Sequence, residues 1–537
     1  MSTTADAGAG TRGPSLGRAS ALGALGTVGS RLTGFLRTVV VAAAVGTAGF
    51  AESYNVANTT PNIVYDLLLG GVLTSVVVPV LVRAHAEDDD GGVAFSQALL
   101  SAVALALTVV AALAVLAAPL LVDLYLGSAA GAKRDQAVLF TRFFLPQLVA
   151  YGITATAGAV LTTRGRFGRD SAVPVLNNLV VVATAVVFVL MQGPARVDTA
   201  TVSHSQVLVL AVGTTLGVAV MAMALLPSLR SAGVPWRWRW DLPRHRLASS
   251  ARLAGWVVVA VLVTQAGFAV VTRLASDQGL FSTYSFAYQL FQLPYAIVGV
   301  SVVAALLPAM SRHAATGRTD RLRAEVSRGL RLAGVLVVPA ALGLAALAVP
   351  LAVATFHGQA GGSRAVLIGR VLAVFALGLV PFTVQQILLR SFFAAADSRT
   401  PALLTTVVTV VLVALDTAVA TRWDGAARVV GLAGGFAAAY AVGAVVTGLL
   451  VRRRLGGRGR RVVRLYVRVS AASAAAVGAG WLAARGVAEL LSGTAGALAQ
   501  LGAAGVLAPP LYLAGLRVTR VRELDPLLAP IRRRLAR

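Results

Sequence analysis

The stretch AFSQALLSAVALALTVVAALAVLAAPLLV, residues 94–122, contains no charged side chain. About 20 apolar residues in a helix are enough to cross the roughly 30 Å hydrocarbon core of a bilayer, so this stretch predicts a membrane-spanning helix. On both sides of it, apolar stretches of similar length alternate with connectors that contain charged residues, glycine or proline. The sequence thus predicts fourteen spans, near residues 21–45, 53–82, 94–122, 137–162, 171–192, 205–229, 247–275, 281–311, 328–355, 363–393, 401–421, 427–451, 463–486 and 494–517.

The composition agrees with an all-α polytopic membrane protein. Of the 537 residues, 57% are hydrophobic and 13% are charged, whereas about 25% of the residues in a soluble domain are charged. The chain contains no cysteine, which excludes disulfides and thiolate chemistry. Its five histidines lie scattered in polar connectors without the spacing of metal ligands. No cofactor or metal is therefore expected.

Arginine-rich connectors predict the orientation of the chain. They follow mostly the even-numbered spans, as in VRRRLGGRGRRVVR (451–464), while connectors after odd spans are nearly neutral, as in SDQGLFST (276–283). The acidic connector RAHAEDDDGG (83–92) is an exception. Because cytoplasmic loops carry the excess of Lys and Arg, both termini are predicted to be cytoplasmic. The same rule accounts for the net charge of +26, so we expect no nucleic-acid partner.

The second predicted span is unusually polar. Four residues of YNVANTTPNIVYDLLLGG (54–71) lie at positions i, i+3, i+7 and i+10, on one face of a helix: Asn55, Asn58, Asn62 and Tyr65. Pro61 interrupts the hydrogen-bond ladder, and Gly70 and Gly71 loosen the following turns, which makes them candidate gating positions. A polar, broken helix must face protein or a water-filled cavity. Its polar groups would then line a cavity or, alternatively, only join neighbouring spans.

Two arginines lie in the first predicted span. A basic residue at the centre of a spanning helix costs about 2.5–3.5 kcal/mol on insertion scales, yet SRLTGFLR (30–37) contains Arg31 and Arg37. We interpret them as lining a hydrated, cationic cavity; snorkelling, or pairing of Arg37 with Asp66, is the alternative. Because guanidinium groups bind phosphate oxygens in bidentate fashion, the cavity indicates an anionic substrate, with phosphate or pyrophosphate first.

Polar residues also occur in the C-terminal spans. Gln289, a candidate cavity residue, precedes Pro294, a further candidate gating position, in a span whose layout is similar to that of span two. Arg273 is either a cavity residue or an outer anchor paired with Asp277. Asp416 is a candidate for binding a coupling cation or proton, or else a structural hydrogen-bond acceptor. The carboxylates within the spans are single and no phosphate-binding glycine loop is present, so we expect no enzyme activity.

Two stretches suggest that the chain contains two similar halves. GRFGRDSAVPVLNN and AAADSRTPALLTTV each place a proline, Pro174 or Pro401, at the start of a fifth span, counted from span one or span seven. Such repeats are typical of transporters, with the site between the halves. The expected division is a disordered cytoplasmic tail (1–20), an N-lobe of six spans (21–240), a C-lobe of six spans (241–455), spans thirteen and fourteen (456–518) and a basic cytoplasmic tail (519–537).

Five stretches resemble the MurJ/MviN lipid II flippases: SRLTGFLR, AVGTAGFAESYNVANTTPN, GGVLTSVVVPVL, LPYAIVGVSVVAALLPAMSRHAATG and RSFFAAADSRTPALL. The arginine- and alanine-rich composition is similar to that of actinobacterial members. The family belongs to the multidrug/oligosaccharidyl-lipid/polysaccharide exporter superfamily, whose members share two six-helix lobes around a central cavity. The resemblance implies movement of lipid II, the lipid-linked peptidoglycan precursor, from the inner to the outer leaflet of the cytoplasmic membrane. It also implies a lipid-tail groove at spans thirteen and fourteen, contacts with membrane lipids, and cell-wall synthesis or division proteins as partners.

Several residues match the family pattern and two depart from it. Matches are Ser30, Arg31, Arg37, the acidic Glu52 (a candidate gating residue) and Pro61–Asn62. Many members carry a basic residue where this chain has Tyr65, and an arginine where it has Gln289, so the cavity is less basic than usual. Either Arg273 takes the place of these missing basic residues, or the cavity binds its substrate with fewer cations. Alternative functions are export of drugs or of another polyprenyl-linked glycan, and a non-transport membrane scaffold for cell-wall synthesis.

Overall fold

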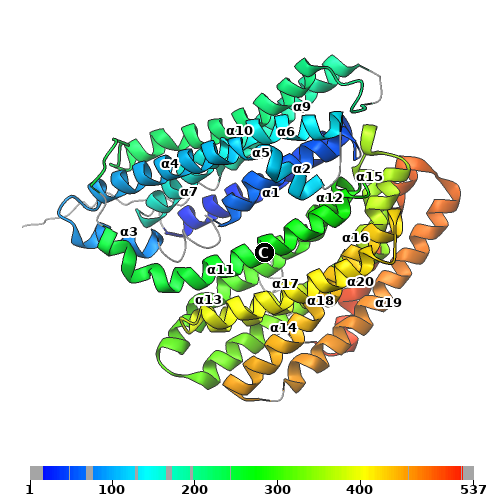
Figure 1. Ribbon diagram of the computed structural model, residues 1–537. Coiled ribbons are helices and arrows are strands. Elements are labelled where there is room, and N and C mark those ends of the chain that lie inside the picture. The colour runs from blue at the N-terminus through cyan, green and yellow to red at the C-terminus, as the bar shows by residue number, and fades with distance from the viewer. Residues whose placement is uncertain are drawn as a thin grey trace, which may run out of the picture.

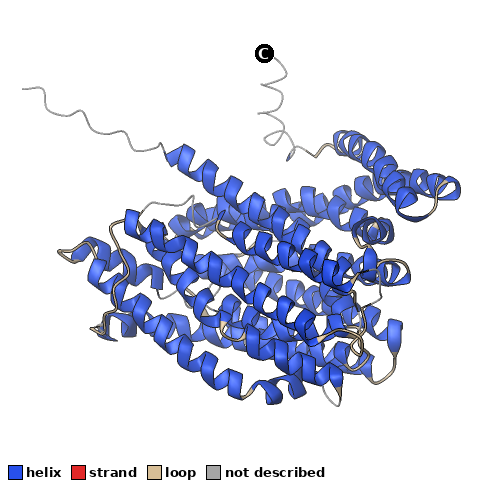
Figure 2. Cartoon of the chain, turned by 90° about the horizontal axis from the view of Figure 1, so that it is seen from above, coloured by secondary structure: helices blue, strands red, loops and turns tan. Residues whose placement is uncertain are grey.

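The computed structural model describes residues 16–47, 49–67, 77–126, 131–164, 172–193, 197–241, 244–457, 459–521 and 523. Among them the chain forms only helices and loops, as Figure 2 shows. The all-α expectation is therefore confirmed for the part of the chain that the structure describes.

Two groups of helices follow one another along the chain. The N-terminal group comprises α1 (Leu16–Val45), α2 (Phe50–Leu67), α3 (Val78–Glu87), α4 (Val93–Leu116), α5 (Ala118–Leu126), α6 (Ala132–Phe144), α7 (Gln147–Thr163), α9 (Pro174–Gln192) and α10 (His204–Ser231). The C-terminal group comprises α11 (Arg244–Ser276), α12 (Phe281–Pro294), the π-helix η2 (Tyr295–Gly299), α13 (Val300–Ala315), α14 (Thr319–Ala346), α15 (Ala348–Thr355), the 3₁₀ turn η3 (Gly358–Ala360), α16 (Ser363–Ala394), α17 (Arg399–Ala420), α18 (Gly425–Leu455), α19 (Arg460–Leu490) and α20 (Gly493–Val518).

Twelve helical segments in the described residues are long and apolar enough to cross a membrane. They correspond to the predicted spans three to fourteen, so the count of fourteen is not itself confirmed. The two other predicted spans, 21–45 and 53–82, fall on α1 and on α2 with the residues after it. Pro174 and Pro401 lie in the first turns of α9 and α17, as predicted.

Among the predicted spans three to fourteen, three break between two helices. The span over 94–122 breaks at Ala117, between α4 and α5, and Pro119 lies in the first turn of α5. Proline lacks an N–H and is favoured in the first helical turn, where that donor is not needed. Similar breaks separate α6 from α7 at Pro146 and α14 from α15 at Leu347. Continuous hydropathy in the sequence conceals these breaks.

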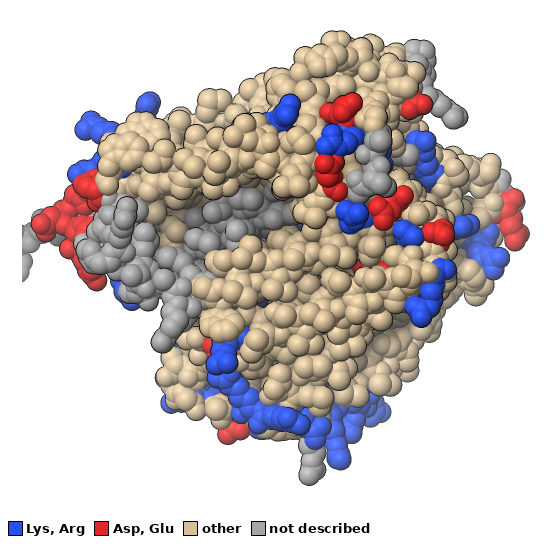
Figure 3. Space-filling view, in the orientation of Figure 1, with Lys and Arg blue, Asp and Glu red and all other residues tan. Residues whose placement is uncertain are grey.

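The two groups converge at one end and separate at the other. In Figure 1 the blue and cyan helices form the upper group and the green to red helices form the lower group, and they meet at the right. At that end α1 contacts η3, α2 contacts α11 and α12, and α5 contacts α11, while α3 also contacts α11 toward the other end. Toward the opposite, open end the described surfaces of the two groups lie apart in Figure 3, and we call the space between them the hollow. The predicted lobe boundaries stay predictions.

Aromatic clusters stabilise each group. Phe50 stacks on Phe188 with ring centroids 5.7 Å apart in the N-terminal group. In the C-terminal group, Phe291 lies 5.5 Å from Phe375 and 5.3 Å from Phe436. Edge-to-face and offset pairs at such separations contribute about 0.5–1.5 kcal/mol each beyond their burial.

Helices α19 and α20 form a hairpin against α14 and α15. The Tyr466 hydroxyl donates to the Leu330 carbonyl oxygen at 3.1 Å, and Tyr512 donates to the Val335 carbonyl oxygen at 2.5 Å. Gly334 allows this approach, because a Cβ there would lie 2.8 Å from the Tyr466 ring. The other face of the hairpin remains apolar and exposed, for example at Val506.

Candidate substrate cavity

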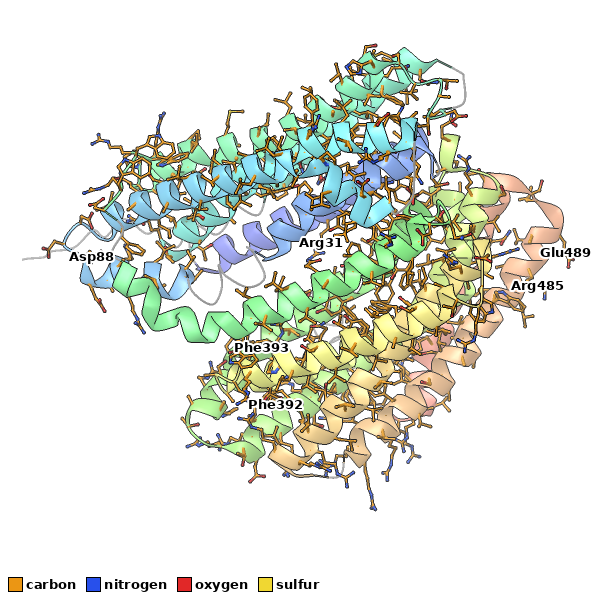
Figure 4. All side chains as sticks on the ribbon, viewed as in Figure 1. Arg31, Asp88, Phe392, Phe393, Arg485 and Glu489 are labelled. Carbon is orange, nitrogen blue, oxygen red and sulfur yellow. The ribbon has the colours of Figure 1, made fainter. Side chains whose placement is uncertain are left out.

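The first cation of the hollow is Arg31 of α1. In Figure 4 its side chain extends from α1 into the space between the two groups. No carboxylate among the described residues forms an ion pair with Arg31 or with Arg37, and the side chain of Asp66 lies outside the described residues. Asn178 of α9 positions this part of α1, since its Nδ2 donates to the Ser30 carbonyl oxygen at 3.2 Å and to Thr33 Oγ1 at 3.0 Å. The predicted site residue Ser30 is thus held through its backbone.

A second cation, Arg390 of α16, was not expected from the sequence. It lines a cavity of about 350 Å³ between α11, α16 and α17, together with Gln265 and Gln386. Its guanidinium carbon lies 5.7 Å from the centroid of the Phe393 ring. Its buried Nε has no hydrogen-bond partner in the described part of the chain. A buried, unsatisfied guanidinium nitrogen is a position that a ligand oxygen stabilises.

Arg31 and Arg390 act electrostatically on the same side chain, Tyr295. Tyr295 is the first residue of the π-helix η2, directly after Pro294. A π-turn within a longer helix is common at functional sites, and here it follows the proline that was predicted to gate the cavity. The structure therefore brings one cation from each group of helices toward the start of this turn.

Arg273 has a different environment. Its Nη1 donates to the backbone carbonyl oxygens of Asp123 at 3.4 Å and Leu124 at 3.3 Å, both in α5. It forms no ion pair with Asp277 within the described residues, and neither Arg31 nor Arg390 is among its contacts. Arg273 thus links α11 to α5 near the end where the two groups meet.

The polar face of α2 is partly used by neighbouring helices. Asn55 Nδ2 donates to Ser282 Oγ at 2.9 Å, and Asn62 Oδ1 accepts the Tyr151 hydroxyl at 3.4 Å. Asn58 is half-buried and has no hydrogen-bond partner in the described residues. Among the asparagines on the polar face of α2, Asn58 is therefore the one whose amide remains available. Gly70, Gly71 and the side chain of Tyr65 lie outside the described residues.

A buried carboxylate holds the converging end together. Glu52 of α2 is 0% exposed, and its Oε1 accepts the Phe281 N–H at 3.0 Å. Its Oε2 accepts the N–H and the hydroxyl of Ser282, both at 3.3 Å. These donors lie at the N-terminus of α12, where the helix dipole and the unpaired N–H groups favour a negative charge. Glu52 thus fastens α2 of one group to α12 of the other.

Gln289, a predicted cavity residue, takes part in a second such link. Thr38 Oγ1 of α1 donates to Gln289 Oε1 at 2.6 Å. The Gln289 Nε2 lies 3.4 Å from Ser285 Oγ within α12. Both ends of the Gln289 amide are therefore occupied by protein groups, one of them across the junction between the groups.

Asp416 of α17 is an isolated buried carboxylate. It is 0% exposed, and neither of its side-chain oxygens has a hydrogen-bond partner within the described residues. Gly435 of α18 makes room for it, because a Cβ there would overlap Oδ1. A lone carboxylate in a low-dielectric interior is costly unless a proton or a cation neutralises it. If Asp416 were a structural hydrogen-bond acceptor, a donor would lie beside its carboxylate, and none of the described residues supplies one.

Comparison with known proteins identifies the family. The family model "Lipid II flippase MurJ" matches residues 41–494. The "Lipid II flippase MurJ" of Burkholderia cenocepacia is 29% identical over 390 residues, covering 70% of this chain and 72% of that protein. The "Probable lipid II flippase MurJ" of Rhizobium meliloti is 28% identical over 397 residues, covering 70% of each chain.

Solved structures confirm the fold. The structure "Lipid II flippase MurJ, inward closed conformation" is similar with a TM-score of 0.74 and 16% identity, over 95% of this chain and all of that one. A multidrug resistance MATE family transporter of the MOP superfamily in an inward-facing conformation is similar with a TM-score of 0.65 and 16% identity, over 79% and 94% of the two chains. From the family match over most of its length, this chain belongs to the lipid II flippase family MurJ.

Proposed function

We propose that this chain moves lipid II from the inner to the outer leaflet of the cytoplasmic membrane by alternating access. The observation that carries this proposal is a pair of cations from opposite groups of helices, Arg31 of α1 and Arg390 of α16, which both act electrostatically on Tyr295. Neither has a carboxylate partner among the described residues, so a pyrophosphate is a matched counter-ion.

The open end of the hollow faces the cytoplasm in this proposal. Connectors after even-numbered spans carry most of the arginine, and the connector between α10 and α11 lies at the open end in Figure 1. Because basic loops remain cytoplasmic, we assign the observed state as inward-open, with both termini on the cytoplasmic side.

Transport proceeds by closing the open end and opening the other. The pyrophosphate of lipid II binds Arg31 and Arg390, the Asn58 amide contacts the head group, and the polyprenyl tail remains in lipid along α19 and α20. The rocking motion separates Glu52 from α12 and bends the α12–α13 helix at Pro294, where the missing N–H weakens the hydrogen-bond ladder. Substrate release then occurs at the outer leaflet.

Asp416 supplies the coupling site in this scheme. Uptake of a proton or a small cation by the buried carboxylate changes the charge of the C-terminal group by one unit. Such a change shifts the equilibrium between the inward-open and outward-open conformations if the carboxylate is more accessible in one of them. The chemistry is transport, with no bond of the substrate made or broken.

The experiment is a lipid II accessibility assay in vesicles that contain the purified chain. Arg31→Ala and Arg390→Ala each remove charge-assisted hydrogen bonds, so we expect flipping rates to fall by about 10- to 100-fold. Arg485→Ala is the matched control, because this arginine stacks on Trp481 of α19 and lies far from the hollow in Figure 4. Wild-type rates in both cavity variants would overturn the proposal.

The same variants separate the alternatives. An exporter of drugs or of another polyprenyl-linked glycan would be unaffected by depletion of lipid II. A scaffold for cell-wall or division proteins would tolerate both cavity substitutions and depend on the basic connectors instead.

A further inference from the structure

Five arginines surround a small pocket where α14, α19 and the residues after α20 meet. The pocket has a volume of about 220 Å³. One carboxylate lines it, that of Glu523, whose Oε1 lies 2.9 Å from Arg331 Nη1. The other four guanidinium groups form no ion pair within the described residues. The five arginines are Arg331 of α14, Arg461, Arg464 and Arg468 of α19, and Arg520 after α20.

The backbone at Arg520 is strained in a way that serves this pocket. Its φ of 54° lies in the left-handed region that favours glycine. The turn buries Val521 against α14 and α19, and the Val521 N–H donates to the Leu516 carbonyl oxygen at 3.0 Å. Glycine would make the same helix-ending turn without strain. The chain instead places a cation there, facing the pocket, and brings Glu523 back to Arg331.

Apolar surface adjoins the pocket on the side of the helical hairpin. Val467 precedes Arg468 and is 64% exposed, and Val518 at the end of α20 is 82% exposed. A larger cavity of about 610 Å³ shares Arg461 and combines other arginines with apolar residues such as Leu388 and Val451. Figure 3 shows arginine side chains gathered along the lower edge of the C-terminal group.

We propose that this pocket binds the phosphate head group of an anionic membrane phospholipid. Guanidinium groups bind phosphate oxygens in bidentate fashion, and basic pockets between helices at the cytoplasmic surface recognise lipid head groups. The excess of arginine in cytoplasmic connectors explains how many charges are present. It does not explain their convergence on one pocket or the strained arginine. The site is separate from the hollow and is independent of the proposed transport activity.

Glu523 acts as the internal counter-ion of the pocket. It occupies Arg331 and so competes with an incoming phosphate. Neutralising this carboxylate leaves all five guanidinium groups available, and lipid binding strengthens although a salt bridge is lost.

The test is native mass spectrometry of the full-length chain in detergent, titrated with phosphatidylglycerol or phosphatidylcholine. Arg461→Gln, Arg464→Gln and Arg468→Gln are combined in one variant. We expect its affinity for phosphatidylglycerol to fall on the order of 100-fold, because each basic residue contributes about a fivefold factor near an anionic lipid. The control variant combines Arg312→Gln, Arg318→Gln and Arg321→Gln, which remove the same charge outside the pocket and leave the affinity unchanged.

Two further arms make the outcome decisive. Glu523→Gln is expected to tighten phosphatidylglycerol binding about fivefold, and it keeps the test valid if the triple variant does not fold. Added lipid II at equal concentration leaves the phosphatidylglycerol bound. Equal losses in both triple variants, equal binding of phosphatidylcholine, weaker binding in Glu523→Gln, or displacement by lipid II would each overturn the proposal.

Discussion

Replacing Glu52 by glutamine tests how the converging end is held closed. Both carboxylate oxygens accept hydrogen bonds from the N-terminus of α12, with distances of 3.0, 3.3 and 3.3 Å. Glutamine keeps one acceptor and turns an NH₂ group toward the Ser282 N–H, so a donor meets a donor. Hydrogen bonds to a charged group contribute about 1.5–3 kcal/mol, and the helix dipole adds up to about 2 kcal/mol in partly buried sites. The observed state should therefore lose about 2–4 kcal/mol relative to the state open at the other end.

That loss corresponds to a shift of about 30- to 1,000-fold in the equilibrium between the two states. The chain contains no cysteine, so a single Thr264→Cys in the cavity beside Arg390 is a clean reporter. A charged thiol reagent added from the cytoplasmic side should label it more slowly after Glu52→Gln. Glu489→Gln, on the exposed tip of α19, is the control and should leave the labelling rate unchanged. An unchanged rate in Glu52→Gln would refute the role given to this link.

The remaining predictions concern three other sites. Thr38→Val removes the 2.6 Å hydrogen bond to α12 and should slow the same labelling reaction by a smaller factor, about fivefold for roughly 1 kcal/mol. Gly435→Ala pushes a methyl group into Asp416 and should lower the stability by about 1–3 kcal/mol in thermal unfolding. Gly434→Ala is the control, because its Cβ would make only an ordinary van der Waals contact at 3.8 Å. We expect this variant to keep the wild-type stability. In the connector before α17, burial raises the pKa of Asp397, but hydrogen bonds from a neighbouring threonine and arginine outweigh it and hold the pKa below its ordinary value. The ionised form therefore stabilises the fold at neutral pH, and this contribution disappears as the pH falls through the folded-state pKa. Asp397→Asn should accordingly lower the unfolding temperature at neutral pH, and the difference should vanish in acid.

The sequence predicts the helices of this fold well, because hydropathy alone marks a span. The breaks inside spans, such as the one at Ala117, are concealed, since alanine and leucine continue the apolar pattern across them. A proline near the break is the available signal, and Pro119 and Pro146 provide it.

The cavity was harder to predict, because its residues come from two groups of helices. Arg31 stands out in the middle of an apolar stretch, whereas Arg390 lies near the predicted end of a span, where a snorkelling arginine is ordinary. Gln289 was expected to contact substrate, and the structure shows it bonded to Thr38. Such a pairing depends on how two distant segments pack, which no local pattern reveals. Glu52 was placed at a gating position by resemblance, and its capping of α12 gives a physical reason for an acid there.

The most direct test of the central claim is equilibrium binding of lipid II to Arg31→Gln, Arg390→Gln and the double variant in a double-mutant cycle. If both guanidinium groups hold one pyrophosphate, each single variant should bind about 10- to 100-fold more weakly. The two effects should also be coupled by more than about 0.5 kcal/mol. Wild-type affinity in both single variants would contradict a substrate site between the two groups of helices.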